Sequence, residues 1–294
     1  MDFGKLPSVD DISFSLPADH PGVKKVLGGA KNNIRIYTGA PVWTDKGFVG
    51  MIYPEGTKEK DFLYHYSRQF SCIELNSTHY AIPSPETIRK WKETVPPGFK
   101  FCPKVPQTIS HAKRIDQCIN EMNYFIETIN GFEDNLGASF LQLPPVFSAR
   151  EIKNLMYFLD KIDPIHLSIE LRHPNWFVHT EQLKELCNFL YQKKMGLVIT
   201  DVAGRRDVLH MRLTNKTAMI RFGANNLHAS DSPRIDEWVE RICLWIANGL
   251  EELYFLMHTP KKYLTAPLAV DFINKLNPHL TTKLPNLILQ DNIF

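Results

Sequence analysis

The chain alternates short apolar runs with longer amphipathic segments from about residue 34 onward. Short apolar runs of this kind are typical of buried strands. Eight such runs occur, at residues 34–40, 72–77, 100–105, 138–144, 167–173, 197–202, 218–223 and 253–258. We therefore expect eight strands, most of them followed by a helix.

The segments between the runs carry helix signals. Serine precedes proline at 84–85 and at 232–233, which predicts a capping serine and a proline at the first helical position. Ser148 and Glu151 have the spacing of a capping box. Residues 203–215 are short and polar and predict the weakest helix. One segment has the i, i+3, i+4, i+7 spacing of a helix with one buried face, at Leu183, Leu186, Cys187 and Leu190.

Eight strands alternating with about seven helices predict an α/β fold, a (β/α)8 TIM-type barrel. The alternative is an open doubly wound sheet, which usually carries a glycine-rich first turn for a nucleotide. The chain has neither GxGxxG nor GxxxxGK[ST], so no nucleotide-cofactor motif is present. We assign residues 34–279 to a single barrel domain, residues 1–33 to an N-terminal extension and residues 280–294 to a C-terminal tail.

Polar residues occupy the inward positions near the ends of these strands. Side chains alternate across a strand, so Ile73 and Leu75 face the helices while Glu74 faces the barrel interior. Active sites of such barrels lie where the strands end. The same alternation gives the inward set Glu74, Asn76, Lys104, Gln142, Glu170, Arg172, Arg221 and His258, and Asp201 lies near the end of strand six.

The charges in this set point to a pocket. A buried carboxylate needs a partner, and Lys104, Arg172 and Arg221 can supply the counter-charges. The structural alternative stays open, because Glu170 and Arg172 are two residues apart on one strand face and could form a purely structural ion pair.

Aromatic residues follow three of the strands. Trp43, Tyr80 and Trp176 come after strands one, two and five, where they would either cover the core or stack on a sugar or a base. The tryptophans at 91, 238 and 245 lie on helix faces and are assigned to packing.

Composition and charge restrict the kinds of partner that the protein is expected to bind. The chain of 294 residues has 34 basic and 32 acidic residues, a formal net charge of +2 that argues against duplex nucleic acid or an anionic membrane. Its five cysteines are scattered and never spaced as CxxC, which argues against a disulfide framework or a zinc ribbon. The start is acidic and broken by prolines, without signal-peptide character, and no apolar run is long enough to span a bilayer. We expect a cytoplasmic protein.

Compact catalytic motifs are missing. There is no GxSxG nucleophile elbow and no HExxH metal motif. A divalent metal held by Glu74, Glu170, Asp201 and His258 from separate strands remains a less favoured alternative, because sequence spacing cannot test it.

Several ordered motifs resemble the YecE-like family, also known as domain of unknown function 72. They are FVGMIYP (48–54), IELNSTHY (73–80), the stretch at 91–111, FLQLPP (140–145), IELRHPNW (169–176) and VITD (198–201), within a match over about residues 34–278. The resemblance implies a TIM-type barrel and no known activity. The positions that match the family's recurrent polar motifs are Glu74, Asn76, Tyr80, Lys104, His111, Gln142, Glu170, Arg172, His173, Trp176 and Asp201.

The chain also departs from that family. Strand one leads into TGAPVW, where a glycine–tryptophan turn is usual. His79 stands where phenylalanine is commoner, and strand eight ends in LMHTP, where many members carry asparagine. If the end of strand eight contacts a ligand, the substrate of this protein differs from that of typical members.

Three functions follow from these observations. The first is an enzyme that does acid–base chemistry on a small polar or anionic substrate, a phosphate, carboxylate or sugar. The second is metal-dependent phosphoester or sugar chemistry. The third is a non-catalytic module that binds a metabolite or nucleic acid. The aromatic residues and the basic loop 203–212 support this third function. The predicted catalytic residues are Glu74, Glu170, Asp201 and His173; the predicted binding residues are Trp43, Asn76, Tyr80, Lys104, His111, Gln142, Arg172, Trp176, Arg221 and His258.

Overall fold

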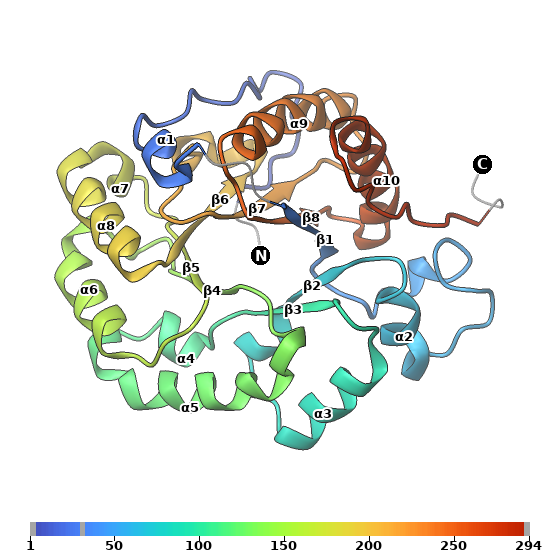
Figure 1. The fold of residues 1–294 in the computed structure, drawn as a ribbon, viewed down its shortest axis with the longest axis horizontal. Coiled ribbons are helices and arrows are strands. Elements are labelled where there is room, and N and C mark those ends of the chain that lie inside the picture. The colour runs from blue at the N-terminus through green and yellow to red at the C-terminus, as the bar shows by residue number, and fades with distance from the viewer. Residues whose placement is uncertain (1–3, 30–32, 291–294) are drawn as a thin grey trace.

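Eight parallel strands form a nearly closed barrel in the computed structural model, which describes residues 4–29 and 33–290 (Figure 1). The hydrogen-bonded order is β3-β2-β1-β8-β7-β6-β5-β4. Between β3 and β4 the ring is completed by Gly137 N–H, which donates to Phe101 O at 2.7 Å, and by Val105 N–H, which donates to Phe140 O at 3.0 Å. The predicted TIM-type barrel is confirmed. The strands are β1 Arg35–Ala40, β2 Cys72–Leu75, β3 Lys100–Pro103, β4 Ser139–Gln142, β5 Leu167–Glu170, β6 Gly196–Asp201, β7 Thr217–Gly223 and β8 Glu252–His258.

Helices surround the strands on the outside of the ring (Figure 1). They are α1 Gly22–Leu27, α2 Phe62–Tyr66, α3 Pro85–Thr94, α4 Gln107–Ser110, α5 Ile119–Ile129, α6 Ile152–Lys161, α7 Asn175–Val178, α8 Thr180–Lys193, α9 Asp231–Ala247 and α10 Thr265–Leu276. Short 3-10 turns join them, including η3 Asn76–His79 after β2 and η7 Ala203–Val208 after β6. None of the helices in the described ranges is long and apolar enough to cross a membrane.

Each predicted strand is present, and strands β2, β3, β4 and β5 end two or three residues earlier than their apolar runs. Ser84 caps α3 as predicted, because its hydroxyl accepts from Thr87 N–H at 3.2 Å. The prediction for Ser232 is wrong: α9 begins at Asp231, and the Ser232 hydroxyl instead donates to Asp271 on α10 at 2.8 Å. The weak helix predicted at 203–215 is only the 3-10 turn η7.

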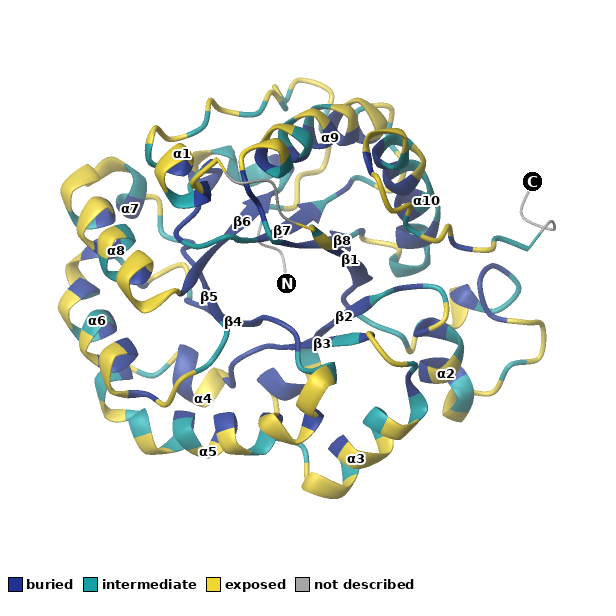
Figure 2. Cartoon of the chain, viewed as in Figure 1, coloured by how far each residue is buried: buried dark blue, intermediate teal, exposed yellow. Residues whose placement is uncertain are grey.

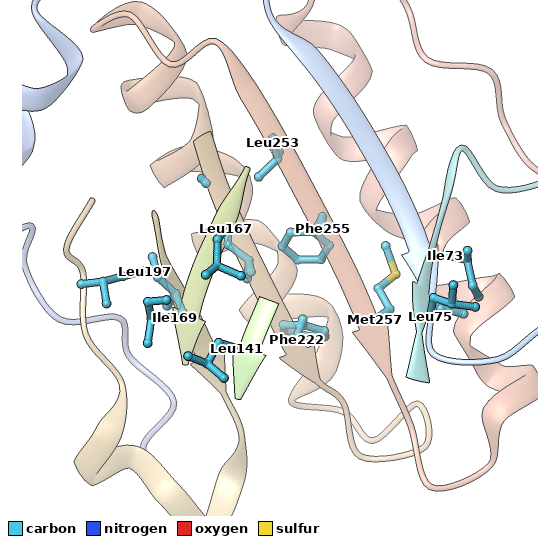
Figure 3. Close-up of a cluster of buried hydrophobic side chains, with 14 of the residues drawn as sticks. Ile73, Leu75, Leu141, Leu167, Ile169, Leu197, Phe222, Leu253, Phe255 and Met257 are labelled. Carbon is cyan, nitrogen blue, oxygen red and sulfur yellow. The ribbon is translucent and has the colours of Figure 1, made fainter. Parts of the chain in front are cut away.

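Alternation along the strands separates two apolar sets. The outward set, which includes Ile73, Leu75, Ile169, Phe222 and Phe255, is buried beneath the helices (Figure 3). The helices bury the faces that meet these side chains and expose their other faces (Figure 2). The inward set forms a separate buried cluster of Cys72, Cys102, Ala138, Phe140, Val198, Met219, Tyr254 and Leu256. The barrel interior is therefore a packed core rather than a channel.

Close packing at β1 explains one glycine. A Cβ at Gly39 would lie 2.6 Å from the carbonyl oxygen and 2.7 Å from the sulfur of Cys72, its partner in the register with β2. Since only glycine fits there, β1 contributes no side chain at this level of the barrel interior. The inward cluster of apolar side chains from other strands, which includes Cys72, packs there instead.

Candidate functional site

A layer of polar side chains covers the inward apolar cluster at the C-terminal ends of the strands. On β2, for example, Glu74 follows Cys72 by two residues, and on β7 Arg221 follows Met219 by two. The alternation that buries an apolar residue at one level thus places a polar residue at the next level. We call this set the polar layer: Glu74, Lys104, Gln142, Glu170, Thr200, Arg221 and His258. The C-terminal ends of the strands around it are called the mouth.

Arg221 is the centre of the polar layer. Its Nε and Nη2 donate to the two carboxylate oxygens of Glu74, each at 2.9 Å, and its Nη1 donates to Glu170 at 2.9 and 3.1 Å. Both carboxylates are fully buried. The guanidinium also lies over the ring of Phe140, 5.5 Å from its centre. Burial alone would lower the pKa of Arg221, but the two carboxylates raise that pKa above its ordinary value.

Glu170 accepts hydrogen bonds on both oxygens. Besides Arg221, its donors are Arg172 Nε at 2.8 Å, Thr200 Oγ1 at 2.9 Å and Gln142 Nε2 at 2.7 Å. Burial alone would raise the pKa of Glu170, but Arg172, Arg221 and the donated hydrogen bonds lower it to about 2. A carboxylate offers about four acceptor sites, so Glu170 has none left for a substrate.

Glu74 is saturated in the same way. Asn76 Nδ2 donates to Oε1 at 3.0 Å and His258 Nε2 donates to Oε2 at 2.8 Å, in addition to the two bonds from Arg221. Burial raises the pKa of Glu74, and Arg221 and His258 more than reverse this effect, so the pKa lies well below its ordinary value. Glu74 is therefore a fixed negative charge at neutral pH.

His258 has one nitrogen engaged and one available. Because the Glu74 carboxylate only accepts, His258 Nε2 carries the proton of the neutral ring, and Nδ1 is an acceptor. Among the described residues, no hydrogen bond to Nδ1 is found, and the side chain is 22% exposed at the mouth. Burial lowers the pKa of His258 more than Glu74 raises it. The ring is neutral at pH 7 and its Nδ1 can accept a proton.

Lys104 lies directly after β3, with its side chain buried at 2% exposure. Its Nζ donates to Gln142 Oε1 at 2.8 Å and forms no ion pair with a carboxylate of the described residues. Burial is the main cause that lowers the pKa of Lys104 to about 8, and Arg221 and Arg172 lower it further against the pull of Glu74 and Glu170.

Two histidines lie near Lys104 on this side of the mouth. His79, at the end of η3, is buried and bonds Val105 O through Nδ1 at 2.9 Å; its ring lies 5.4 Å from that of the exposed His111. Burial lowers the pKa of His79 to about 4, with the positive charges of Lys104, His111 and Arg172 acting in the same direction. The pKa of His111 is lowered by burial and by Lys104 and Arg172. Both histidines are therefore neutral at pH 7, and the positive charge on this side of the mouth comes from Lys104 and Arg172.

The structure places Asp201 outside the polar layer. Its oxygens accept from Arg206 and Arg234, the latter at 3.0 Å, and from Trp238 Nε1 on α9 at 2.8 Å, so the side chain faces the helices. The alternation in β6 could have shown this, because Leu197 and Ile199 face outward and the next outward position is 201. Thr200, which was not among the predicted site residues, takes the inward position.

Other predicted residues have structural contacts. His173 Nδ1 accepts from Asn175 N–H at 3.0 Å at the start of α7, and no hydrogen bond joins it to the polar layer within the described ranges. Trp176 is fully buried and donates to Phe147 O at 2.9 Å, so it is no stacking platform. Trp43 packs edge-on against Trp91 on α3, with ring centres 5.5 Å apart.

Of the predicted aromatic residues at the mouth, only Tyr80 is open to solvent, at 73% exposure and edge-on to His79. The basic loop at 203–212 is used internally. Arg205 donates to Arg172 O at 2.9 Å, and Arg206 donates to Phe14 O at 2.8 Å. Arg205 and Arg206 are therefore used in contacts within the chain rather than in an open basic surface.

The predicted metal ligands are not brought together. Glu74 and His258 are in contact, Glu170 lies beyond the guanidinium of Arg221, and Asp201 lies outside the barrel. Among residues 4–29 and 33–290 no group of three or more His, Cys, Asp or Glu side chains could hold a metal ion. The donors that are present suit an anion rather than a cation.

The fold and the polar layer together define a TIM-type barrel with a charged, buried network at the mouth. The chain belongs to the family described as "Protein of unknown function DUF72", which matches residues 37–288. It is 30% identical over 244 residues to the protein named "UPF0759 protein YecE" from Escherichia coli K12, covering 76% of this chain and 86% of that protein. Over 150 residues it is 26% identical to "UPF0759 protein YunF" of Bacillus subtilis, covering 48% of this chain and 52% of that one.

A crystal structure of a DUF72 family protein from Enterococcus faecalis has the same fold. The TM-score is 0.68 at 18% sequence identity, with 86% of this chain and 100% of that chain covered. A second crystal structure of a DUF72 protein from the same organism gives a TM-score of 0.64, also at 18% identity. No activity is established for the family.

Proposed function

We propose that the protein is an enzyme that binds a small anionic substrate at the mouth of the barrel and moves a proton with His258. The observation that carries this proposal is Lys104, a buried amine whose Nζ has a neutral amide as its partner and two arginines nearby. Burying a cation is costly unless an anion pairs with it. A bound phosphate or carboxylate would supply that missing partner.

The positive charge of Arg172 near Lys104 supports anion binding. Arg172 lies within electrostatic reach of Lys104 and lowers its pKa, and the charges of both residues lower the pKa values of His79 and His111. A bound anion would offset this mutual repulsion and accept hydrogen bonds from Nζ. Charge-assisted hydrogen bonds of this kind are about twice as strong as neutral ones.

His258 is the best proton acceptor at the mouth. Glu74 fixes the ring by accepting from Nε2, which leaves Nδ1 with its lone pair on a partly exposed side chain. A general base works best when its neutral form is populated at the working pH, and the lowered pKa of His258 provides that form.

The two buried carboxylates take a different role from the one that sequence analysis gave them. Glu74 and Glu170 are saturated with donors, and their pKa values lie far below neutral pH, so neither exchanges a proton there. We assign them as positioning residues: Glu74 orients His258, and Glu170 orients Gln142 and Arg172.

Titration calorimetry with inorganic phosphate and with acetate at pH 7 tests the anion site. The wild type should bind at least one of them, and Lys104→Met should weaken that binding by roughly tenfold or more, the size expected for a lost charge-assisted hydrogen bond. Lys100→Met is the matched control, because Lys100 begins the strand that Lys104 follows but bonds Asp134 O at the other end of the barrel. Equal affinity in wild type and Lys104→Met would overturn the proposal.

A further inference from the structure

The amine of Lys104 offers a lone pair as well as a charge. We infer that the substrate carries a carbonyl group beside its anionic group, and that Lys104 Nζ forms an imine with that carbonyl carbon. This inference rests on the proposed anion site and adds the class of substrate, a small 2-oxo acid or an aldehyde that bears a carboxylate or phosphate.

The backbone holds Lys104 firmly at the mouth. Its N–H donates to Leu75 O at 3.3 Å, and its carbonyl oxygen accepts from Thr78 Oγ1 at 2.7 Å, so the end of β2 and the turn η3 that follows it fix the residue. The side chain is 2% exposed. A nucleophile must be held in place relative to its target, and this residue meets that condition.

The contact of Nζ leaves the amine able to react. Gln142 Nε2 donates to Glu170 Oε2 at 2.7 Å, which turns Gln142 Oε1 toward Lys104. Gln142 Oε1 accepts one hydrogen bond from Lys104 Nζ, which requires only one N–H of the amine. A neutral amine can donate this hydrogen and keep its lone pair for attack on a carbonyl carbon.

Structural lysines in the same chain look different. Lys275 pairs with Asp236 at 2.9 Å and with Asp271 at 3.4 Å, and Lys193 pairs with Asp160 at 2.6 Å. Lys104 is more deeply buried than either and has no such pair among the described residues. A lysine that lies beside other cations and out of water is the arrangement that activates amines for imine formation, because both conditions favour the neutral form.

Electrostatics supplies the neutral amine. With a pKa of about 8, roughly one tenth of Lys104 is neutral at pH 7, against well under a thousandth for a lysine in water. Arg172 is the adjacent cation that would hold the anionic group of the same molecule. The chain therefore combines a nucleophile and an anion site on one side of the mouth.

The step balances without any redox partner. The Nζ lone pair forms a bond to the carbonyl carbon, and the electrons of the C=O π bond go to oxygen, which takes a proton. The carbinolamine then loses this oxygen as water, its second proton coming from the nitrogen. The protonated imine and one water replace the ammonium form and the carbonyl. The imine draws electrons from the neighbouring carbon, whose proton His258 Nδ1 would accept.

Reductive trapping tests the inference. The full-length protein is incubated with pyruvate or glyoxylate and cyanoborohydride, which adds hydride to an imine and leaves a stable secondary amine. Peptide mass spectrometry then locates the adduct. We expect modification concentrated on Lys104, at a rate at least roughly tenfold above that of exposed lysines because of the larger neutral fraction. Inorganic phosphate should suppress it by competing for the anion site.

Variants and the competition separate the outcomes. Lys104→Met should remove the concentrated adduct and Lys100→Met should keep it; the phosphate competition in wild type needs no variant to fold. Adducts spread evenly over exposed lysines, or no adduct on Lys104 with either acid, overturn the imine. If calorimetry still shows phosphate binding in that case, the proposed function stands without the imine; if phosphate also fails to bind, both fall.

Discussion

Two buried clusters in this barrel are built from the same residue types. Inside the barrel, Arg221 lies between the carboxylates of Glu74 and Glu170. Outside it, between β6 and α9, Asp201 accepts from Arg206 and Arg234. All three carboxylates are fully buried. Burial and ion pairing alone therefore cannot tell a functional cluster from a structural one.

The two clusters differ in whether their side chains keep hydrogen-bonding capacity that a ligand could use. The outer cluster joins segments: Trp238 also donates to Asp201, and the guanidinium of Arg234 lies over the rings of Phe14 and Phe222 at 4.4 and 4.3 Å. Its aromatic surroundings close it to a ligand, although Arg234 Nε has no acceptor. The inner cluster leaves spare bonding capacity on Lys104 and His258, which face the mouth. Unused hydrogen-bonding capacity at a strand end is the feature by which we distinguish the candidate functional cluster from the structural one.

The largest effect is expected from Arg221→Met. The change leaves Glu74 and Glu170 buried without their shared cation, and breaking one buried ion pair already costs roughly 3–5 kcal/mol. We expect a loss of roughly 5 kcal/mol or more in the free energy of unfolding, measured by urea denaturation followed by circular dichroism. Stability within about 1 kcal/mol of wild type would contradict the central position of Arg221.

Asp201→Asn tests the outer cluster. The charge opposite Arg206 and Arg234 is removed, so we expect a loss of roughly 3–5 kcal/mol in the free energy of unfolding. Faster hydrogen exchange should follow in the segment around Phe14, which these arginines hold. Phosphate binding should stay unchanged in calorimetry. Loss of that binding in a folded Asp201→Asn protein would erase the distinction between the two clusters.

Acid sensitivity should come from the inner cluster. The pKa of Glu170 falls from 4.5 to about 2 on folding, so between these values the unfolded chain binds the extra proton. The stabilisation, on the order of 3 kcal/mol, is fully present above about pH 4.5 and is lost as the pH falls toward 2. Urea denaturation at a series of pH values measures it. Glu170→Gln, which cannot titrate, should flatten the profile over this range; an unchanged profile would contradict the assignment.

The smallest effect on stability is expected from His258→Asn. The asparagine amide can still donate to Glu74, so the free energy of unfolding should change by no more than about 1 kcal/mol. His258→Leu should cost about 1–3 kcal/mol, because a Glu74 oxygen loses its donor. Hydrogen–deuterium exchange at the carbon beside the carbonyl of pyruvate, followed by NMR, should stop in both variants if His258 is the base. Exchange at the wild-type rate in the folded asparagine variant would remove that role.

The sequence predicted which charged side chains of the inner cluster face inward, but it did not predict every neighbouring position correctly. Alternation alone was enough to turn Glu74, Glu170 and Arg221 inward, because each lies between apolar outward neighbours. The same rule applied to β6 would have turned Asp201 outward and Thr200 inward. No sequence pattern predicted the burial of Trp176, because a tryptophan in a loop does not follow the alternation of a strand or the periodicity of a helix.

The state of Lys104 could not be predicted at all. It depends on β3, β4 and β5 lying side by side, so that Gln142 bonds Lys104 with one end and Glu170 with the other. A shift of one residue in any strand would change these partners. Ser232 shows the same limit at a helix: the serine–proline pair is present, but the contact with Asp271 on α10 replaces the cap.

The most direct test is the titration of Lys104 itself. NMR of the protein with isotope-labelled lysine, assigned by comparison with Lys104→Met, follows its protonation with and without inorganic phosphate. We predict titration with a pKa of about 8 in the free protein, because burial and two arginines disfavour the charge, and a higher pKa when phosphate is bound. A pKa near the ordinary 10.5 that phosphate does not change would contradict the account.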